Sequence, residues 1–157
     1  MKKLIPFFSL VVSGLLISTL AIAQPEPMEF KTVDNFFLKN DVRLSAGINC
    51  MVFTNAAQFN KAFGAAKTAT NTVSTPNFTT QRVAAIAIPP SYRKTQLIVD
   101  KVEMSGSFVY IHFREVLGEN LSSTSTPLTI ISFDRASFIK VVAFYKDKKL
   151  VKSFAVK

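Results

Sequence analysis

The chain has 157 residues, a formal charge of +9 and one cysteine, which fits a single domain and excludes an internal disulfide. Its 15 phenylalanines and low glycine content are typical of a globular domain and exclude a disordered chain.

An uncharged apolar segment occupies the start of the chain. Lys2 and Lys3 come first, residues 4–23 carry no charge, and the run ends in Ala-Ile-Ala. This order is typical of a secretory signal peptide, so we predict residues 1–23 to be one, with cleavage between Ala23 and Gln24. The alternative is an uncleaved membrane anchor, because the run is about long enough to span a bilayer. Interrupting proline, serine and glycine residues favour the signal peptide.

The predicted signal places the protein in a periplasmic or extracellular space. Gln24 stands where a lipoprotein would have cysteine, and no second long apolar run follows, so we expect a soluble chain with no transmembrane segment after cleavage. Loss of Lys2 and Lys3 lowers the formal charge from +9 to about +7. Such charge favours contact with acidic surfaces, and export argues against nucleic acid as the partner. The alternative is that the charge only keeps the domain soluble.

The first part of the mature chain predicts a leader and two strands. Residues 24–29 contain two prolines and are predicted to be a flexible leader, followed by one β-rich domain over residues 30–157. Residues 30–38 are predicted to form one strand, and the apolar run over residues 46–53 predicts a buried strand.

A single short helix is predicted near residues 55–64. Thr54 or Asn55 can cap its first turn, since either side-chain oxygen can accept a backbone N–H. Phe59 and Phe63 lie one turn apart and are expected to pack on the strands. Gly64 is expected to end the helix in a left-handed conformation.

The rest of the chain predicts a series of strands separated by short connections. We expect loops over residues 89–94 and 118–126 and a turn at Ser105-Gly106. Because the connections are too short for parallel crossovers, we predict a mainly β fold, an antiparallel β-sandwich or barrel-like domain. The predicted strands cover residues 82–88, 95–104, 107–115, 128–133, 138–145 and 150–156.

One predicted strand has two distinct faces. Alternation turns Val109, Ile111 and Phe113 toward the core. The opposite face is either half-covered by another element or a recognition surface, and it carries Phe108, Tyr110, His112 and Arg114. We therefore name Tyr110 and His112 as candidate partner contacts.

The predicted loop after residue 88 contains a second candidate contact. Two prolines precede Tyr92, Arg93 and Lys94, which combine an aromatic ring with two cations. Proline lowers the entropy that a loop loses on binding, so these three residues suit a contact surface. The alternative is an ordinary connection between strands.

Residues for catalysis are sparse. Cys50 lies in an apolar run and is interpreted as a small buried residue; the alternatives are an intermolecular disulfide or a nucleophile served by His112, the only histidine. The sequence contains no pattern typical of a zinc site or a phosphate loop. We predict no catalytic, cofactor-binding or metal-binding residues, and no cofactor.

The order of segments resembles the PrcB-like family of exported bacterial proteins, the C-terminal domain of protease complex subunit PrcB. That resemblance implies a β-rich, non-catalytic domain that associates with a peptidase or another envelope protein. The family usually has a glycine-rich loop with a tyrosine, whereas this chain has Tyr92 without glycine. The segments that carry the resemblance are residues 48–53, Phe59, Phe78, residues 83–88, 97–103, 109–113 and 123–131.

These observations lead to three hypotheses of function. The first is an exported, non-catalytic accessory module that binds another exported protein, with an envelope or secreted peptidase as the candidate partner. The second is a binder of anionic polysaccharide or lipid at the cell envelope. The third is a small hydrolase that uses Cys50 or His112.

Overall fold

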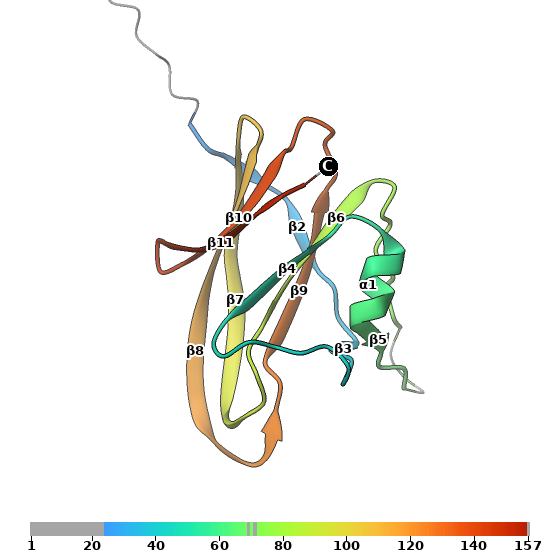
Figure 1. Ribbon diagram of the computed structural model, residues 1–157, viewed down its shortest axis with the longest axis vertical. Coiled ribbons are helices and arrows are strands. Elements are labelled where there is room, and N and C mark those ends of the chain that lie inside the picture. Colours follow the sequence, from blue (N-terminus) through green and yellow to red (C-terminus); the bar gives the residue numbers. More distant parts are fainter. Residues whose placement is uncertain (1–23, 69, 71, 157) are drawn as a thin grey trace, which may run out of the picture.

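The computed structural model describes residues 24–68, 70 and 72–156, which form two facing sheets and a smaller third layer (Figure 1). The predicted signal peptide, residues 1–23, lies outside the described residues. The predicted mainly β, sandwich-like fold with one short helix is confirmed.

Two sheets contain most of the strands, and a two-stranded sheet lies beside the helix. In spatial order, the five-stranded sheet contains β1 (Glu26–Met28), β7 (Ser91–Ser105), β8 (Phe108–Ser125), β10 (Val141–Lys146) and β11 (Lys149–Ala155). The four-stranded sheet contains β2 (Phe30–Thr32), β9 (Leu128–Asp134), β6 (Gln81–Ala87) and β4 (Asn49–Phe53). The third layer contains β3 (Phe36–Leu38), β5 (Phe63–Ala65) and α1 (Ala56–Ala62).

The four-stranded sheet is buried on both faces, and β6 shows why. Ala84 and Ile86 point into the core that this sheet shares with the five-stranded sheet. Val83 and Ala85 point the other way, into a second core formed with α1 and its neighbouring strands. A strand covered on both sides has an almost continuous apolar sequence, which is why this run was recognisable in the chain.

The helix begins as predicted and ends differently. The Asn55 side chain accepts a hydrogen bond from the Gln58 backbone N–H at 2.9 Å. At the other end Phe63 is already extended, with φ −119° and ψ 143°, so the prediction of a left-handed Gly64 cap is wrong. Gly64 instead lies opposite Phe37 in the β3–β5 pair, and a Cβ at Gly64 would collide with the Phe37 ring.

The start of the domain differs from the predicted structure in two places. The segment predicted as a flexible leader contains β1, which pairs antiparallel with residues 102–104 of β7. The single strand predicted over residues 30–38 is divided between β2 and β3, which belong to different sheets. Asn35, between them, has a φ of 64°, a left-handed conformation that breaks an extended strand.

One strand pair is parallel, contrary to the predicted antiparallel arrangement. β10 runs parallel to β8, with Val141 opposite Phe108 and Lys146 opposite Phe113. The chain between them passes through β9 in the opposite sheet. That route supplies the long crossover connection that a parallel pair needs.

The strands β7 and β8 are much longer than predicted. Their antiparallel ribbon extends from Ser105 and Phe108 at the turn to Ser91 and Ser125 at the far end. The predicted loop over residues 118–126 is therefore mostly strand, and so are residues 91–94 of the other predicted loop. Gly106 occupies the turn with a φ of 56°, as a tight turn requires.

Candidate partner-binding face

Four ring side chains gather on the outer face of the five-stranded sheet. β8 contributes Phe108, Tyr110 and His112, and β10 contributes Tyr145; we call these four residues the aromatic face. Residues two apart on a strand point to the same side, so the three rings of β8 turn outward while the apolar residues between them enter the core.

The rings form one connected set. Phe108 and Tyr110 are nearly parallel, with ring centroids 6.2 Å apart. Tyr110 meets Tyr145 edge-on at 6.0 Å, and Tyr145 lies 5.4 Å from the His112 ring. The parallel register puts Tyr145 directly beside His112. Offset and edge-on contacts between aromatic rings are favourable, so the contacts among these four rings stabilise one arrangement of the face without a partner.

Glu103 of β7 fixes the polar edge of the aromatic face. Its carboxylate lies 3.1 Å from His112 Nε2 and 2.6 Å from Lys101 Nζ. The side chains of Glu103 and His112 are 21% and 26% exposed, so this contact is largely shielded from water. The carboxylate orients the imidazole within the sheet surface, as expected for a cross-strand pair.

The aromatic face is accessible while its centre is well packed. Phe108 is 43% exposed, Tyr110, His112 and Tyr145 are half-buried, and Ala143 beneath them is buried. The four-stranded sheet and α1 lie on the other side of the five-stranded sheet (Figure 1). Rings that remain accessible on a rigid sheet are typical of protein interfaces, where aromatic residues are enriched.

The other three predicted contact residues lie elsewhere. Tyr92, Arg93 and Lys94 belong to the far end of β7, where Arg93 is paired with Asn120. Glu103, opposite Tyr110, is ten positions along the same strand, which corresponds to roughly 30 Å. The structure therefore separates the predicted contact set into two surfaces.

The far surface is open on both sides. Tyr92 is 64% exposed, and Arg93 Nε donates a hydrogen bond to the Gly118 carbonyl at 3.2 Å. Lys94 Nζ approaches the Glu119 carboxylate at 3.9 Å, with both side chains well exposed. Both cations therefore already contact residues of β8, the neighbouring strand of the same ribbon.

Tyr145, the fourth ring of the face, was not among the predicted contact residues. It ends the strand predicted over residues 138–145 and directly precedes a lysine-rich segment. Its place beside His112 depends on the parallel pairing of β8 with β10, for which no local pattern exists in the sequence. Recognition of that crossover was the missing signal.

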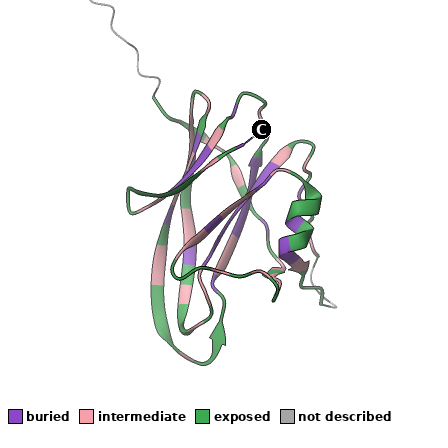
Figure 2. Ribbon diagram, in the orientation of Figure 1, coloured by how far each residue is buried: buried purple, intermediate pink, exposed green. Residues whose placement is uncertain are grey.

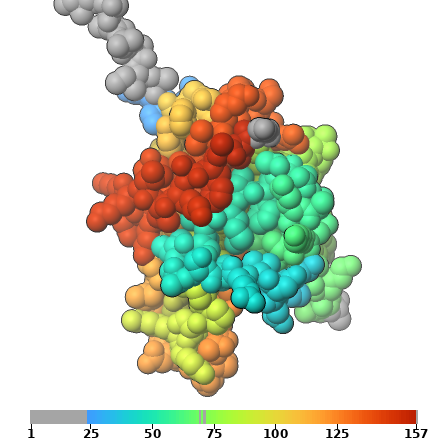
Figure 3. Space-filling view, viewed as in Figure 1, coloured from blue at the N-terminus to red at the C-terminus, as the bar shows by residue number. Residues whose placement is uncertain are grey.

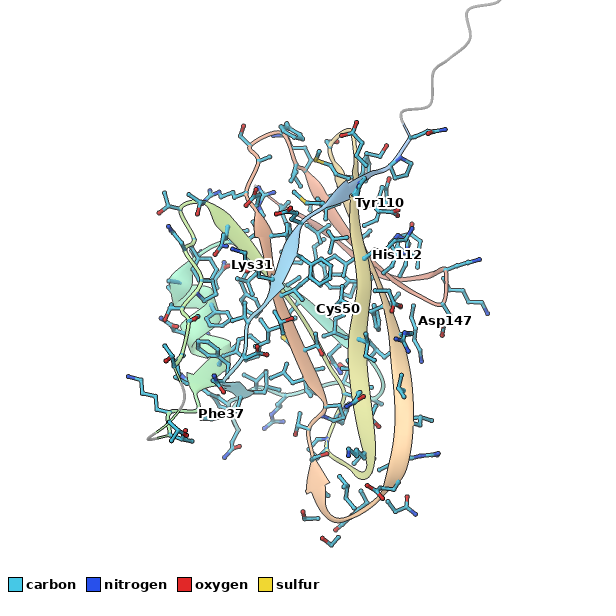
Figure 4. All side chains as sticks on the ribbon, turned by 180° about the vertical axis from the view of Figure 1, so that it is seen from behind. Lys31, Phe37, Cys50, Tyr110, His112 and Asp147 are labelled. Carbon is cyan, nitrogen blue, oxygen red and sulfur yellow. The ribbon has the colours of Figure 1, made fainter. Side chains whose placement is uncertain are left out.

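Cys50 and His112 occupy opposite sides of the five-stranded sheet (Figure 4). Cys50 on β4 is buried in the core between the sheets, whereas His112 belongs to the outer face. Burial raises the pKa of the Cys50 thiol to about 11, against a smaller opposing effect of Lys152. The thiol is therefore protonated at neutral pH and is not joined to the imidazole as a nucleophile requires.

Arg82 is a buried charge within the core. It is 1% exposed, its terminal nitrogen donates to the Ile139 carbonyl at 3.3 Å, and its Nε has no hydrogen-bond partner among the described residues. Burial, followed by repulsion from Arg135, lowers the pKa of the guanidinium. The residue lies inside the fold, so it adds nothing to either surface.

A polar cleft of about 490 Å³ opens where the chain passes from β2 to β3. It is lined by Asp34, Asn35, Thr126 and Thr129, together with apolar residues of β3 and β9. Asp34 is the only acidic side chain among the lining residues, so the cleft lacks the second carboxylate of a paired-carboxylate mechanism.

The described residues contain no group of three or more histidine, cysteine, aspartate or glutamate side chains that could hold a metal ion. Among the same residues, no helix has the length and apolar character needed to cross a membrane.

Comparison with known proteins finds no matching family model, no matching curated protein and no matching solved structure. The resemblance to the PrcB-like family stays a prediction.

Proposed function

We propose that this protein is an exported, non-catalytic accessory module that binds a partner protein through the aromatic face. The observation that carries the proposal is the connected set of four accessible rings on the outer face of the five-stranded sheet. Aromatic anchors at the centre of a contact supply most of the binding energy in many protein interfaces. The partner is another exported protein, and a peptidase is the class that the PrcB-like resemblance implies.

The charges around the face support a protein partner over a uniform polyanion. Glu103 neutralises Lys101 and contacts His112, and Asp100 pairs with Arg114 Nε at 2.8 Å on the same sheet. The surroundings of the rings are therefore balanced in charge rather than strongly basic. A rim of paired charges around an aromatic centre resembles the anatomy of protein interfaces.

The test is capture of the partner by the immobilised chain, followed by measurement of its affinity. We expect Tyr110→Ala with Tyr145→Ala to weaken binding of the captured protein at least tenfold, because interface hot spots exceed about 2 kcal/mol. Phe108→Ser provides a second variant that removes a more exposed ring. Mass spectrometry of the captured protein shows whether it is a peptidase.

The matched control is Tyr92→Ala with Arg93→Ala, at the far end of the same ribbon. This pair removes one ring and one cation without touching the aromatic face, so it should leave affinity within about twofold. Unfolding midpoints of all variants show whether a loss of binding reflects loss of fold. If the control pair abolishes binding and the Tyr110 and Tyr145 changes do not, the partner binds the far surface and the proposal is wrong.

A further inference from the structure

The tip of the hairpin formed by β10 and β11, two strands of the five-stranded sheet, protrudes from the side of the molecule (Figure 1 and Figure 3). Its tip is a two-residue turn, Asp147-Lys148, with φ values of 49° and 66°. Two consecutive positive φ values are typical of the tight turn that matches strand twist. The tip therefore has a defined shape, and Asp147 marks its end in Figure 4.

Three lysines of this hairpin lack an acidic partner among the described residues. Lys148, Lys149 and Lys152 are exposed and form no ion pair among the described residues, whereas Lys146 is held by Glu115 at 2.5 Å. Lys152 lies farther from the tip than the other two, with its Nζ 5.5 Å from the centre of the Phe154 ring. Asp147 is the only acidic residue in the projecting segment. The segment is thus a compact positive surface at the edge of the molecule.

Two aliphatic side chains lie between these lysines. Leu150 is 56% exposed and Val151 is 37% exposed. Leu150 pairs with Tyr145 in the hairpin register, so the Leu150 side chain lies on the same outer face of the sheet as the Tyr145 ring. Exposed aliphatic residues placed beside lysines are unfavourable in water and suit a boundary between headgroups and hydrocarbon.

From this arrangement we propose that the tip of the β10–β11 hairpin docks on an anionic lipid bilayer. The three lysines contact acidic headgroups, and Leu150 and Val151 enter the boundary between headgroups and acyl chains. A soluble acidic polysaccharide satisfies the lysines but offers no apolar phase to the two aliphatic side chains. The lipid surface therefore accounts for both features of the hairpin, independently of the partner proposed for the aromatic face.

The test is sedimentation of the chain with lipid vesicles. The chain used begins at Gln24, because every described strand and the helix follow that residue and the apolar run before it would itself partition into lipid. We expect binding to vesicles that contain phosphatidylglycerol and none to pure phosphatidylcholine. Binding should weaken strongly above about 0.1 M salt, where exposed charges are screened within about 10 Å.

The variants separate local charge from total charge. Lys148→Asn, Lys149→Gln and Lys152→Gln together should reduce vesicle affinity about a hundredfold, at roughly fivefold per lysine. Asparagine is used at residue 148 because it tolerates a positive φ. The control combines Lys31→Gln, Lys61→Gln and Lys67→Gln, which removes the same charge from exposed positions outside the hairpin. An equal loss in the control would overturn the proposal.

A fluorescent reporter tests insertion directly. The chain has no tryptophan, so Leu150→Trp places a single indole on the hairpin. We expect its emission to shift to shorter wavelength with anionic vesicles, while Tyr92→Trp at the far end of β7 shows no shift. Binding to heparin without binding to vesicles, or an unshifted Leu150→Trp spectrum, would assign the lysines to a soluble polyanion and overturn the lipid proposal.

Discussion

The two ends of the β7–β8 ribbon share the same pair of strands and differ in how far their residues are buried (Figure 2). At the turn end β1 flanks β7 and β10 flanks β8, and Val102, Val109 and Ile111 beneath the surface are at most 1% exposed. At the far end neither neighbour reaches the ribbon, and Tyr92 and Leu117 are 64% and 51% exposed.

This difference separates what backbone pairing does from what burial does. The antiparallel register continues to Ser91 and Ser125 with irregularities near Arg93. Pairing therefore extends the strands without a core beneath them. Burial at the turn end holds the aromatic face rigid, while the far end owes its shape mainly to hydrogen bonds that water can also supply.

Removal of a large side chain from each end gives the largest expected contrast. Phe113 is 2% exposed on the core side of β8, and Phe113→Ala should lower the free energy of unfolding by about 3–5 kcal/mol through lost burial and a residual cavity. Leu117→Ala, four positions along the same strand, should change it by less than about 0.5 kcal/mol. Urea unfolding of both variants measures the contrast. Similar losses of unfolding free energy for the two variants would show that the Leu117 side chain is buried in solution, contrary to this description of the far end.

High pH should weaken the core beneath the turn end selectively. The thiol of Cys50 has a pKa of about 11 in the folded state against an ordinary value of 9.0. The stability that this raised pKa represents is complete below pH 9 and is lost as the pH rises to about 11, because only the unfolded chain releases the proton there. The loss linked to Cys50 should be about 2–3 kcal/mol.

Cys50→Ala provides the comparison, since lysine and tyrosine titration is common to both proteins. The difference in unfolding free energy between the original chain and Cys50→Ala should narrow or reverse over this pH range. In the same range, alkylation of Cys50 in the folded chain should stay slow until unfolding. Parallel pH profiles for the two proteins would contradict a buried thiol.

Two glutamates give the smallest contrast between the ends. Glu103 is largely shielded and contacts both Lys101 and His112, so Glu103→Gln should lower the free energy of unfolding by about 1 kcal/mol. Glu119 at the far end meets Lys94 at 3.9 Å with most of both side chains in water, so Glu119→Gln should cost about 0.3 kcal/mol or less. Thermal unfolding at low and high salt measures both effects. A larger salt dependence at Glu103 than at Glu119 would be unexpected, because shielded pairs are screened less.

The sequence predicted best where burial imposes a pattern. The run in β6 is apolar because both its faces are covered, and the Asn55 cap is a local interaction between neighbours. Tyr110 and His112 were recognised as one face because alternation in β8 is strong where Val109 and Ile111 fill the core.

The parts of the fold and of the candidate site that were not predicted depend on contacts between distant residues, which leave no local pattern in the sequence. The far half of β8 has water on both faces, so its polar sequence resembles a loop. β1 is held by pairing with β7, and its three residues, which include a proline, do not by themselves predict a strand. Tyr145 belongs to the aromatic face because two distant strands, β8 and β10, pair in parallel. Tyr92 lies far from this face because the predicted loop is part of the long strand β7.

The passage of the chain through β9 between the parallel strands β8 and β10 has a consequence for folding. In the folded chain β10 lies beside β8, while β9, which lies between them in the sequence, pairs with β6 in the opposite sheet. The connection between two neighbouring strands of the five-stranded sheet therefore contributes a strand to the opposite sheet, which links the two sheets through the chain. Because pairings between distant strands must close long loops, the domain should fold slowly for its size, and the aromatic face forms only when β8 and β10 have paired.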